Sequence, residues 1–266
     1  MTFADVGGGA LRAALALALW GLLAAAYAAR ERDGRALQSA RWSALAAFAC
    51  VLAASASMAA ALLAHDFSIR YVALNNAVET PAYFSAISLW AALEGSILLW
   101  TTILAGAVAY VAWRGTRELP RLATTALAVM FAMLAFFLFL VVTPAADPFV
   151  RMDPAPLNGR GPNPLLQDHW LMGLHPPLLY LGYVLFSVPF AYALASLILG
   201  EGGDRGFFSA VLGPPCASKP SGDSISLPDF LGSFFFPPKS SRCFTPLSAS
   251  PFGPATISPS SFTFTG

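Results

Sequence analysis

The sequence predicts an all-α, polytopic membrane protein: a bundle of about five transmembrane helices with two outer loops and a disordered C-terminal tail. Hydrophobic residues make up 57% of the 266 residues and charged residues only 11%, whereas soluble domains carry about 25% charged residues. Mean hydropathy is +0.64, and five apolar stretches each reach the roughly 20 residues that cross a bilayer. The net charge of +1 and the lack of a basic run give no support to nucleic-acid binding.

The predicted spans are rich in Ala and Leu, and small side chains let membrane helices approach closely. The first stretch is too long for a cleavable signal, and its basic residues follow it instead of preceding it. The last opens with two prolines, which a first helical turn tolerates, and Pro189 in its middle predicts a kink. The spans are expected near residues 10–29, 43–64, 89–113, 122–142 and 176–199.

Arginines in the connecting segments predict the orientation. The loops after the first and third spans are arginine-rich, whereas the second and fourth loops mix or balance their charges. Because positive loops stay in the cytoplasm, the N-terminus and the two longer loops are predicted on the outer face of the membrane. In the first of these loops, residues 67–72 alternate between apolar and polar and predict a short extended segment, ending in a turn at Asn75 and Asn76.

Glu94 is the one acidic residue well within a predicted span. An ionisable group inside a membrane is a functional hypothesis, although Glu94 could equally lie at the outer interface and hydrogen-bond a neighbouring helix. Trp90 and Trp100 flank it. They could contact a bound ring, or they could be ordinary interfacial tryptophans.

His175 stands where a polar, proline-rich segment meets the fifth span. An imidazole at the mouth of a helix reaches out of the bilayer while the helix holds it in place, which suits a metal or a haem iron. The alternative is a histidine that caps the helix at the interface. Gly182 and Phe186 share its helical face, at spacings of seven and eleven residues, and could line a flat ligand or serve helix packing. Tyr180 is a further candidate for a pocket or for helix packing.

The segment before His175 carries the hydrogen-bonding groups of Asn163, Gln167 and Asp168. They could shape a pocket or a docking surface, or simply form a structured loop. His169 could be a substitute ligand, but we expect it to be an exposed loop histidine, and we expect His65 to be an interfacial residue at the outer end of the second span. No cysteine pair has the spacing of a metal or haem-attachment motif.

The composition changes after about residue 205. Residues 1–205 form the predicted transmembrane domain, and residues 206–266 are rich in Ser, Pro and Phe with no helical or strand periodicity. This second segment is either a disordered tail or a translation that has left its frame, and we favour the second interpretation.

Two blocks of sequence resemble the CcmF/NrfE family, the membrane haem lyase subunits of cytochrome c maturation. The first runs from Tyr71-Val72-Ala73 through Trp90 and Glu94-Gly95-Ser96 to Leu98-Leu99-Trp100. The second contains Gly159-Arg160, Asn163-Pro164-Leu165-Leu166-Gln167-Asp168, His175-Pro176-Pro177-Leu178-Leu179-Tyr180, Gly182-Tyr183, Phe186-Ser187 and Ala193-Leu194-Ala195-Ser196-Leu197. The resemblance covers about residues 1–205.

The resemblance implies a function in cytochrome c-type biogenesis. Family members receive haem from a periplasmic haem chaperone and join it to apocytochrome c, together with other cytochrome c maturation membrane subunits. His175 matches the family's first outer histidine and is thereby implied as an axial ligand of the haem iron. The resemblance also implies that haem rests on a Trp-rich stretch of the outer face and is held between two outer histidines. This chain departs from that pattern in that no His follows His175 and no Trp follows Trp170, so it carries half of a haem site and is expected to be inactive in ligation alone.

Two other functions fit the sequence. A non-catalytic assembly module would use the outer loops only to dock partners. A small-molecule or proton-coupled transporter would use Glu94 within a bundle of small residues, although the sequence offers neither internal repeats nor further buried charges.

Overall fold

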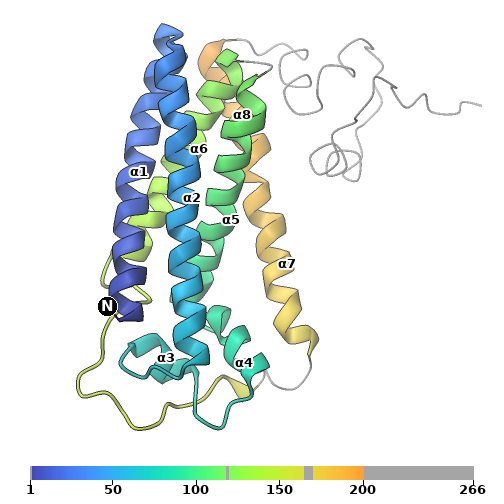
Figure 1. The fold of residues 1–266 in the computed structure, drawn as a ribbon. Coiled ribbons are helices and arrows are strands. Elements are labelled where there is room, and N and C mark those ends of the chain that lie inside the picture. The colour runs from blue at the N-terminus through green and yellow to red at the C-terminus, as the bar shows by residue number, and fades with distance from the viewer. Residues whose placement is uncertain (1, 118–119, 165–169, 201–266) are drawn as a thin grey trace, which may run out of the picture. The chain divides into compact units, whose positions relative to one another are not determined.

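Long apolar helices dominate the chain in a computed structural model that describes residues 2–117, 120–164 and 170–200 (Figure 1). By length and composition, five stretches among these described residues can cross a membrane, as the sequence predicted. Four are single helices, and the fifth is divided into two. They are α1 (Phe3–Glu31), α2 (Gly34–Leu63), α5 (Leu93–Arg114), α6 (Pro120–Val142) and the pair α7 (Leu171–Leu185) and α8 (Ser187–Leu199).

Helices α1 and α2 form a tight antiparallel hairpin through small residues. The turn is set by Arg32, which takes the left-handed conformation, and by Asp33, whose side chain accepts a hydrogen bond from the Arg35 N–H. Apart from Leu11, the buried stripe of α1 consists of Ala and Gly. At Gly21 an added Cβ would overlap the ring of Phe131 on α6. The small size of the residues along this stripe therefore lets three helices meet closely.

Helix α6 lies at the centre of the bundle, packed against α1, α5 and α8. Its large side chains Leu127, Phe131, Leu134 and Leu138 are fully buried. Helix α8 packs on α6 through a stripe that includes Ala191 and Ala195. The core of the described bundle is thus formed around α6, while α7 contacts chiefly α5.

The fifth span is divided where the sequence predicted a kink. Helix α7 ends at Leu185 and α8 begins at Ser187. Pro189 has no N–H to donate to the Leu185 carbonyl, and its ring crowds that carbonyl. The break therefore falls one turn before the proline, as steric exclusion at position i−4 requires.

A platform of short helices and loops covers one end of the bundle. It comprises residues 65–92 and 143–164, and it contains α3 (Arg70–Asn75), α4 (Ala82–Ile87) and the 3-10 helix η1 (Ser88–Trp90). The N-terminal end of α1 lies at the same end (Figure 1). The connections between α1 and α2 and between α5 and α6 lie at the other end, where Arg41 Nε donates to Thr116 Oγ1. The two longer loops thus share one end, as predicted.

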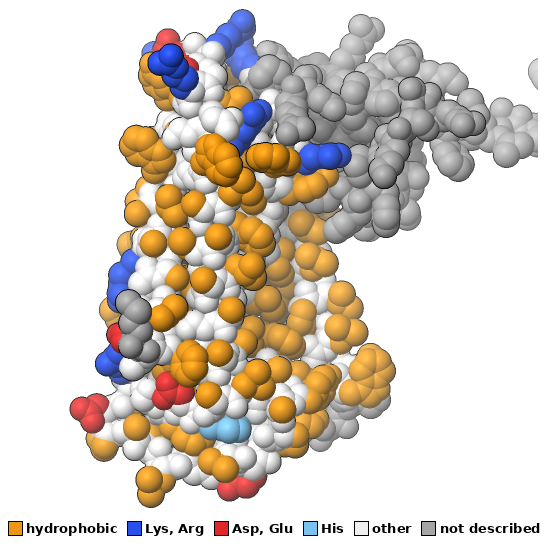
Figure 2. Space-filling view, viewed as in Figure 1, with side chains coloured by type: hydrophobic (Ala, Val, Ile, Leu, Met, Phe, Trp, Pro, Cys, Tyr) orange, Lys and Arg blue, Asp and Glu red, His pale blue; other side chains and the backbone are white. Residues whose placement is uncertain are grey.

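The charge distribution follows this division. Figure 2 shows hydrophobic side chains along the length of the helices and arginine side chains at the end opposite the platform, with further arginines beside acidic side chains towards the platform. Exposed large apolar residues such as Trp20, Leu23 and Phe139 lie on the long helices. A water-soluble protein would bury such side chains, so this surface fits a lipid environment.

Two sequence expectations for local structure were wrong. The predicted extended segment at 67–72 is extended only around Ile69, which forms an isolated antiparallel bridge with Arg151, and α3 begins at Arg70. Alternation over six residues is too short to separate a strand from a turn followed by a helix. Glu94 does not lie well inside a span, because α5 begins only at Leu93, after Ala92 in an extended conformation.

Candidate functional site

His175 lies near the platform end of the fifth span. Helix α7 begins at Leu171, so His175 lies in its second turn instead of at its mouth, and Pro176 and Pro177 lie inside the helix. The expected start at Pro176 was therefore late by just over a turn. The His175 side chain is exposed, and it makes no hydrogen bond or ion pair with another described residue. Its imidazole is thus open to an external ligand.

An exposed apolar face surrounds His175 on α7. Leu178, Leu179 and Phe186 are exposed on it. Gly182 is exposed as well, and a Cβ built there would meet nothing within 4 Å. The predicted face of His175, Gly182 and Phe186 therefore exists, and it points away from the bundle instead of packing on it.

The opposite face of α7 meets α5 through aromatic residues. The rings of Tyr180 and Trp100 lie edge-to-face with centroids 5.4 Å apart. The Tyr180 hydroxyl is 3.5 Å from Ser96 Oγ, and Ser96 Oγ donates to the Trp90 carbonyl. The structure thus brings together three predicted site residues, Trp90, Trp100 and Tyr180, but places them across the helix from His175.

The two tryptophans of this cluster share an unusual feature. The Nε1 atoms of both Trp90 and Trp100 are buried, and neither has a hydrogen-bond acceptor among the described residues. Trp100 also contacts the ring of Phe137 on α6 at 6.1 Å between centroids. The rings around Trp100 provide π-faces, which are weak acceptors for an indole N–H. Their arrangement indicates packing more directly than ligand contact.

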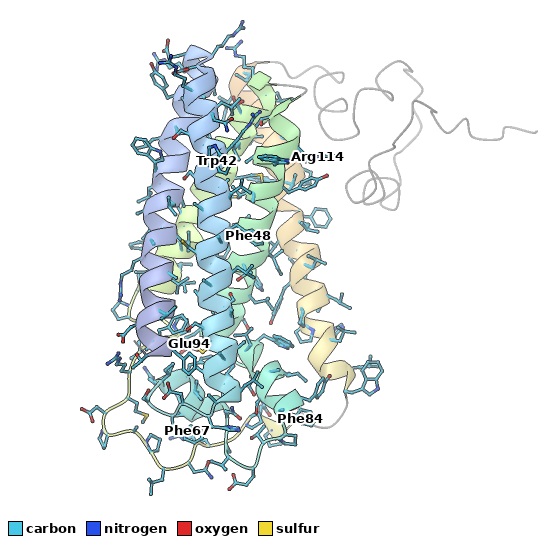
Figure 3. The ribbon with its side chains drawn as sticks, viewed as in Figure 1. Trp42, Phe48, Phe67, Phe84, Glu94 and Arg114 are labelled. Atoms are coloured by element: carbon cyan, nitrogen blue, oxygen red, sulfur yellow. The ribbon has the colours of Figure 1, made fainter. Side chains whose placement is uncertain are left out.

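Glu94 occupies the first turn of α5 at the platform end, opposite Arg114 at the far end of the same helix (Figure 3). A carboxylate in a first turn is favoured by the helix dipole. Burial raises the pKa of the Tyr71 hydroxyl above its ordinary value, and the nearby charge of Glu94 raises it further. This position matches the interfacial alternative and not a charge in the middle of the membrane.

A buried polar network supports the platform beneath these residues. Asn76 is fully buried, donates from Nδ2 to the Leu62 carbonyl at 2.6 Å and accepts from Ser85 Oγ at 3.1 Å. Tyr71 donates its hydroxyl to the carbonyl of Ser88 at 2.8 Å. At Gly95 an added Cβ would overlap the Tyr71 hydroxyl and the Leu89 carbonyl. The network joins α2, α3, α4 and the start of α5, and it leaves room only for glycine at the crossing.

Backbone hydrogen bonds join the two halves of the platform. The N–H of Arg70 donates to Val150, and that of Arg160 donates to Ala73, both at 2.9 Å. Asn158 Nδ2 donates to both carboxylate oxygens of Glu79, which lowers the pKa of Glu79. The loop between α6 and α7 is thereby held along α3.

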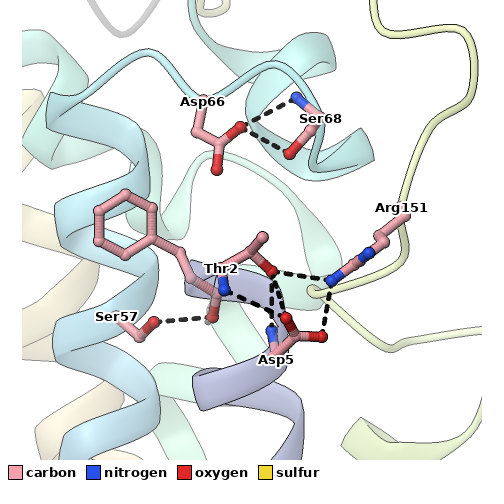
Figure 4. Close-up of polar contacts among 7 residues, drawn as sticks. Thr2, Asp5, Ser57, Asp66, Ser68 and Arg151 are labelled. Carbon is pink, nitrogen blue, oxygen red and sulfur yellow. Dashed lines mark hydrogen bonds and ion pairs between the residues drawn. The ribbon is translucent and has the colours of Figure 1, made fainter.

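The N-terminus is tied to the same platform (Figure 4). Thr2 and Asp5 form a capping box on α1. Arg151 donates from Nη2 to Thr2 Oγ1 at 2.8 Å and to Asp5 Oδ1 at 2.6 Å. Because this ion pair is exposed, it contributes little free energy. Its effect is to fix the position of the loop that carries Arg151.

The remaining predicted residues are placed as follows. Asn163 is exposed in the loop before α7, and Gln167, Asp168 and His169 lie outside the described residues. His65 follows α2 with φ 51°, and its Nδ1 is buried with no partner among the described residues. No group of three or more His, Cys, Asp or Glu that could hold a metal occurs in the described part of the chain. Of the two histidines among the described residues, His175 is exposed and His65 is half-buried.

Sequence reasoning missed the contact between α7 and α4. Tyr83 donates its hydroxyl to the Trp170 carbonyl at 3.0 Å. At Gly173 an added Cβ would collide with Ile87. The first turn of α7 is thus docked directly on α4. Nothing in the local pattern around Tyr83 could signal this contact, because its partner lies 87 residues away.

Comparisons with known proteins support a shared origin. Residues 90–221 match a family model described as cytochrome C assembly protein. The chain is 38% identical over 199 residues to the cytochrome c-type biogenesis protein CcmF of Escherichia coli K12. The aligned residues make up 74% of this chain and 30% of that protein. It is 41% identical over 157 residues to the probable cytochrome c-type biogenesis protein NrfE of the same organism, with 59% and 28% covered.

A solved structure agrees with these matches. The cytochrome c haem lyase CcmF superposes with a TM-score of 0.67 at 36% identity, covering 80% of this chain and 33% of that one. The chain therefore spans about 30% of the length of the curated relatives it matches.

Proposed function

Because the chain belongs to the CcmF/NrfE family of cytochrome c-type biogenesis proteins, we propose that it binds haem through His175 for delivery to apocytochrome c. The chain is a multi-pass membrane protein. We propose that it lies in a bacterial inner membrane, with its N-terminus, platform and His175 on the periplasmic side. The arginine-rich loops at the opposite end support this orientation.

The observation that carries the proposal is the exposed imidazole of His175 on an open face of α7. A neutral imidazole is a common axial ligand of haem iron. The face below it presents leucine side chains and the gap at Gly182, which suit a flat apolar ring. The residues present therefore fit the group that the family resemblance implies.

In this proposal each part of the chain has a defined task. His175 would hold the iron from one side, and the apolar face of α7 would exclude water from the ring. Bound haem would supply the vinyl groups that react with the cysteine thiols of an apocytochrome. The platform would provide the surface for a periplasmic haem chaperone, apocytochrome c and other maturation subunits. Its internal hydrogen bonds keep that surface in a fixed shape.

We further propose that this chain alone does not complete ligation. All six tryptophans lie at or before Trp170 and no His follows His175, so neither a Trp-rich segment nor a second outer ligand comes from this chain. The relatives that match are biogenesis proteins, and their identity does not favour the transporter interpretation.

The proposal is tested by haem titration of the purified full chain in detergent. We expect His175→Ala to change the absorption spectrum of the bound haem and to weaken binding at least tenfold, a loss of about 1.4 kcal/mol. His65→Ala and His169→Ala are matched controls that keep His175. An unchanged spectrum in His175→Ala would overturn the assignment, and a change only in His169→Ala would move the ligand to that residue.

A further inference from the structure

Helix α7 is only lightly held by the rest of the bundle. Among its described residues only Gly173 and Val184 are buried. Helix α8, which continues the same span, buries Val188, Ala191, Tyr192, Ala195 and Ser196. The two halves of the span therefore differ in how firmly they are attached, and His175 is carried by the weaker half.

The break between the two halves limits what α8 can impose on α7. Pro189 removes the hydrogen bond to Leu185 that would have joined them. Ser187 Oγ is buried at the break with no partner among the described residues. Because few hydrogen bonds resist bending or twisting at this point, the rotation of α7 about its axis must be set by contacts along α7 itself.

The contact with α5 falls on one face of α7. Tyr180 carries a large side chain from α7 to α5, where it meets the ring of Trp100 and approaches Ser96 Oγ at 3.5 Å. Gly173 lies seven residues earlier, on the same helical face, and its lack of a side chain lets the first turn rest on Ile87 of α4. Gly173 allows the close approach of α7 to α4 but has no side chain that would resist rotation of α7. The Tyr180 ring, which contacts Trp100, does resist this rotation.

Helical geometry then connects Tyr180 to His175. Five residues separate them, which places the two side chains about 140° apart around the axis. We propose that Tyr180 is a positioning residue: the contact of its ring with Trp100 fixes the rotation of α7 so that His175 faces outward from the bundle. An edge-to-face aromatic pair adds to the stabilisation that buried area alone provides, so this contact favours one rotation of a lightly packed helix.

The first test needs no haem. Cysteines replace Leu63 at the end of α2 and Leu178 on α7, both exposed, in a background with Cys50, Cys216 and Cys243 changed to Ser. Distances between spin labels on the two cysteines are then measured by pulsed electron paramagnetic resonance. We expect Tyr180→Ala to shift and broaden the distance distribution. Tyr183→Ala is the matched control, because Tyr183 is 62% exposed on the same helix, and it is expected to leave the distribution unchanged.

A second variant keeps the test decisive if Tyr180→Ala fails to fold. Trp100→Leu removes the same ring contact from the α5 side and is expected to shift the distances in the same way. Tyr180→Phe keeps the ring and is expected to restore the parent distribution. Identical distributions in the parent, Tyr180→Ala and Trp100→Leu proteins would overturn the proposal.

The consequence for His175 rests on the proposed function and is measured separately. We expect Tyr180→Ala to weaken haem binding about tenfold, because the competent rotation is then only fractionally populated. The spectrum of the bound form should stay the same, since the imidazole is still present, whereas His175→Ala changes that spectrum. If the parent binds no haem, the proposed function fails while the distance measurement still decides the role of Tyr180. A changed spectrum in Tyr180→Ala would count against a purely positioning role.

Discussion

At the scale of single residues, the platform depends on side chains with a defined hydrogen-bond partner, such as Asn76, and on positions where no side chain fits, such as Gly95. Asn76 donates to the Leu62 carbonyl at the end of α2 and accepts from the Ser85 hydroxyl of α4. His65 takes a left-handed conformation after α2, where the N–H of Asp66 donates to Ala61 and that of His65 to Leu62. This is the hydrogen-bond pattern of a Schellman motif, in which glycine is the usual residue. These residues convert helix ends into a compact surface.

Asp147 provides a pH-dependent test of the platform. It follows α6, and its side chain accepts from the Phe149 N–H at 2.8 Å. Burial raises the pKa of Asp147 above its ordinary value, against the opposing effect of that hydrogen bond. The folded state thus holds the proton more tightly than the unfolded state, and ionised Asp147 destabilises the fold above its folded pKa.

We therefore expect Asp147→Asn to raise the thermal unfolding temperature at neutral pH, because an amide oxygen can keep the bond to Phe149. The gain should shrink as the pH falls through the folded pKa of Asp147 and vanish below the unfolded value of about 3.9. Thermal unfolding in detergent across this range measures it, with exposed Asp153→Asn as the control. A gain that is independent of pH would contradict the explanation.

At the scale of elements, the fifth span shows how one proline separates two functions of a helix. Helix α8 is anchored on α6, and Tyr192 lies against Gly115 at the arginine-rich end. Helix α7 reaches the platform and carries His175. In a continuous helix, the packing of α8 would also fix the rotation of α7 and therefore the direction of His175. In the broken helix, the contacts of α7 itself fix that rotation.

Replacing Pro189 tests the break directly. Pro189→Ala supplies an N–H for the Leu185 carbonyl and removes the ring that crowds it, so the helix should run through position 186. We expect amide hydrogen exchange at residues 186–190 to slow about tenfold, as a local gain of roughly 1.4 kcal/mol would produce. Phe190→Ala, an exposed change in the same turn, is the control. Equal exchange rates in Pro189→Ala and the parent would show that the break has another cause.

At the scale of the whole described bundle, the two long loops and the N-terminus form one surface. Arg151 joins the N-terminal cap to the second loop, and Ile69 pairs with that loop from the first. Segments separated by more than 60 residues thus depend on one another at this end. The opposite end has short connections and the clustered arginines.

The orientation is tested by labelling single cysteines in intact cells. Leu157→Cys in the platform, where Leu157 is 99% exposed, should react with a membrane-impermeant maleimide. Gly34→Cys at the opposite end should react only after the membrane is permeabilised. Both variants leave every arginine in place, so the positive charges that set the orientation are unchanged. The reverse pattern of labelling would invert the proposed placement of His175.

Much of this architecture follows from local features of the amino-acid sequence. Five spans follow from apolar runs, and the break in the last one follows from Pro189, because hydropathy and proline geometry act locally. The helix starts were less predictable: α7 begins before its prolines and α5 begins just before Glu94. Helix ends depend on caps and on neighbouring segments, which composition does not contain.

The amino-acid sequence by itself determined that this is a helical membrane protein with a histidine near one end of its fifth span. It also carried the resemblance that leads to haem. Only the tertiary structure decided that His175 faces outward, that Tyr180 meets Trp100, and that Glu94 lies at a helix end. The reason is physical: burial within an apolar run is a property of neighbours in sequence, whereas the rotation of a helix is set by contacts with residues far away along the chain.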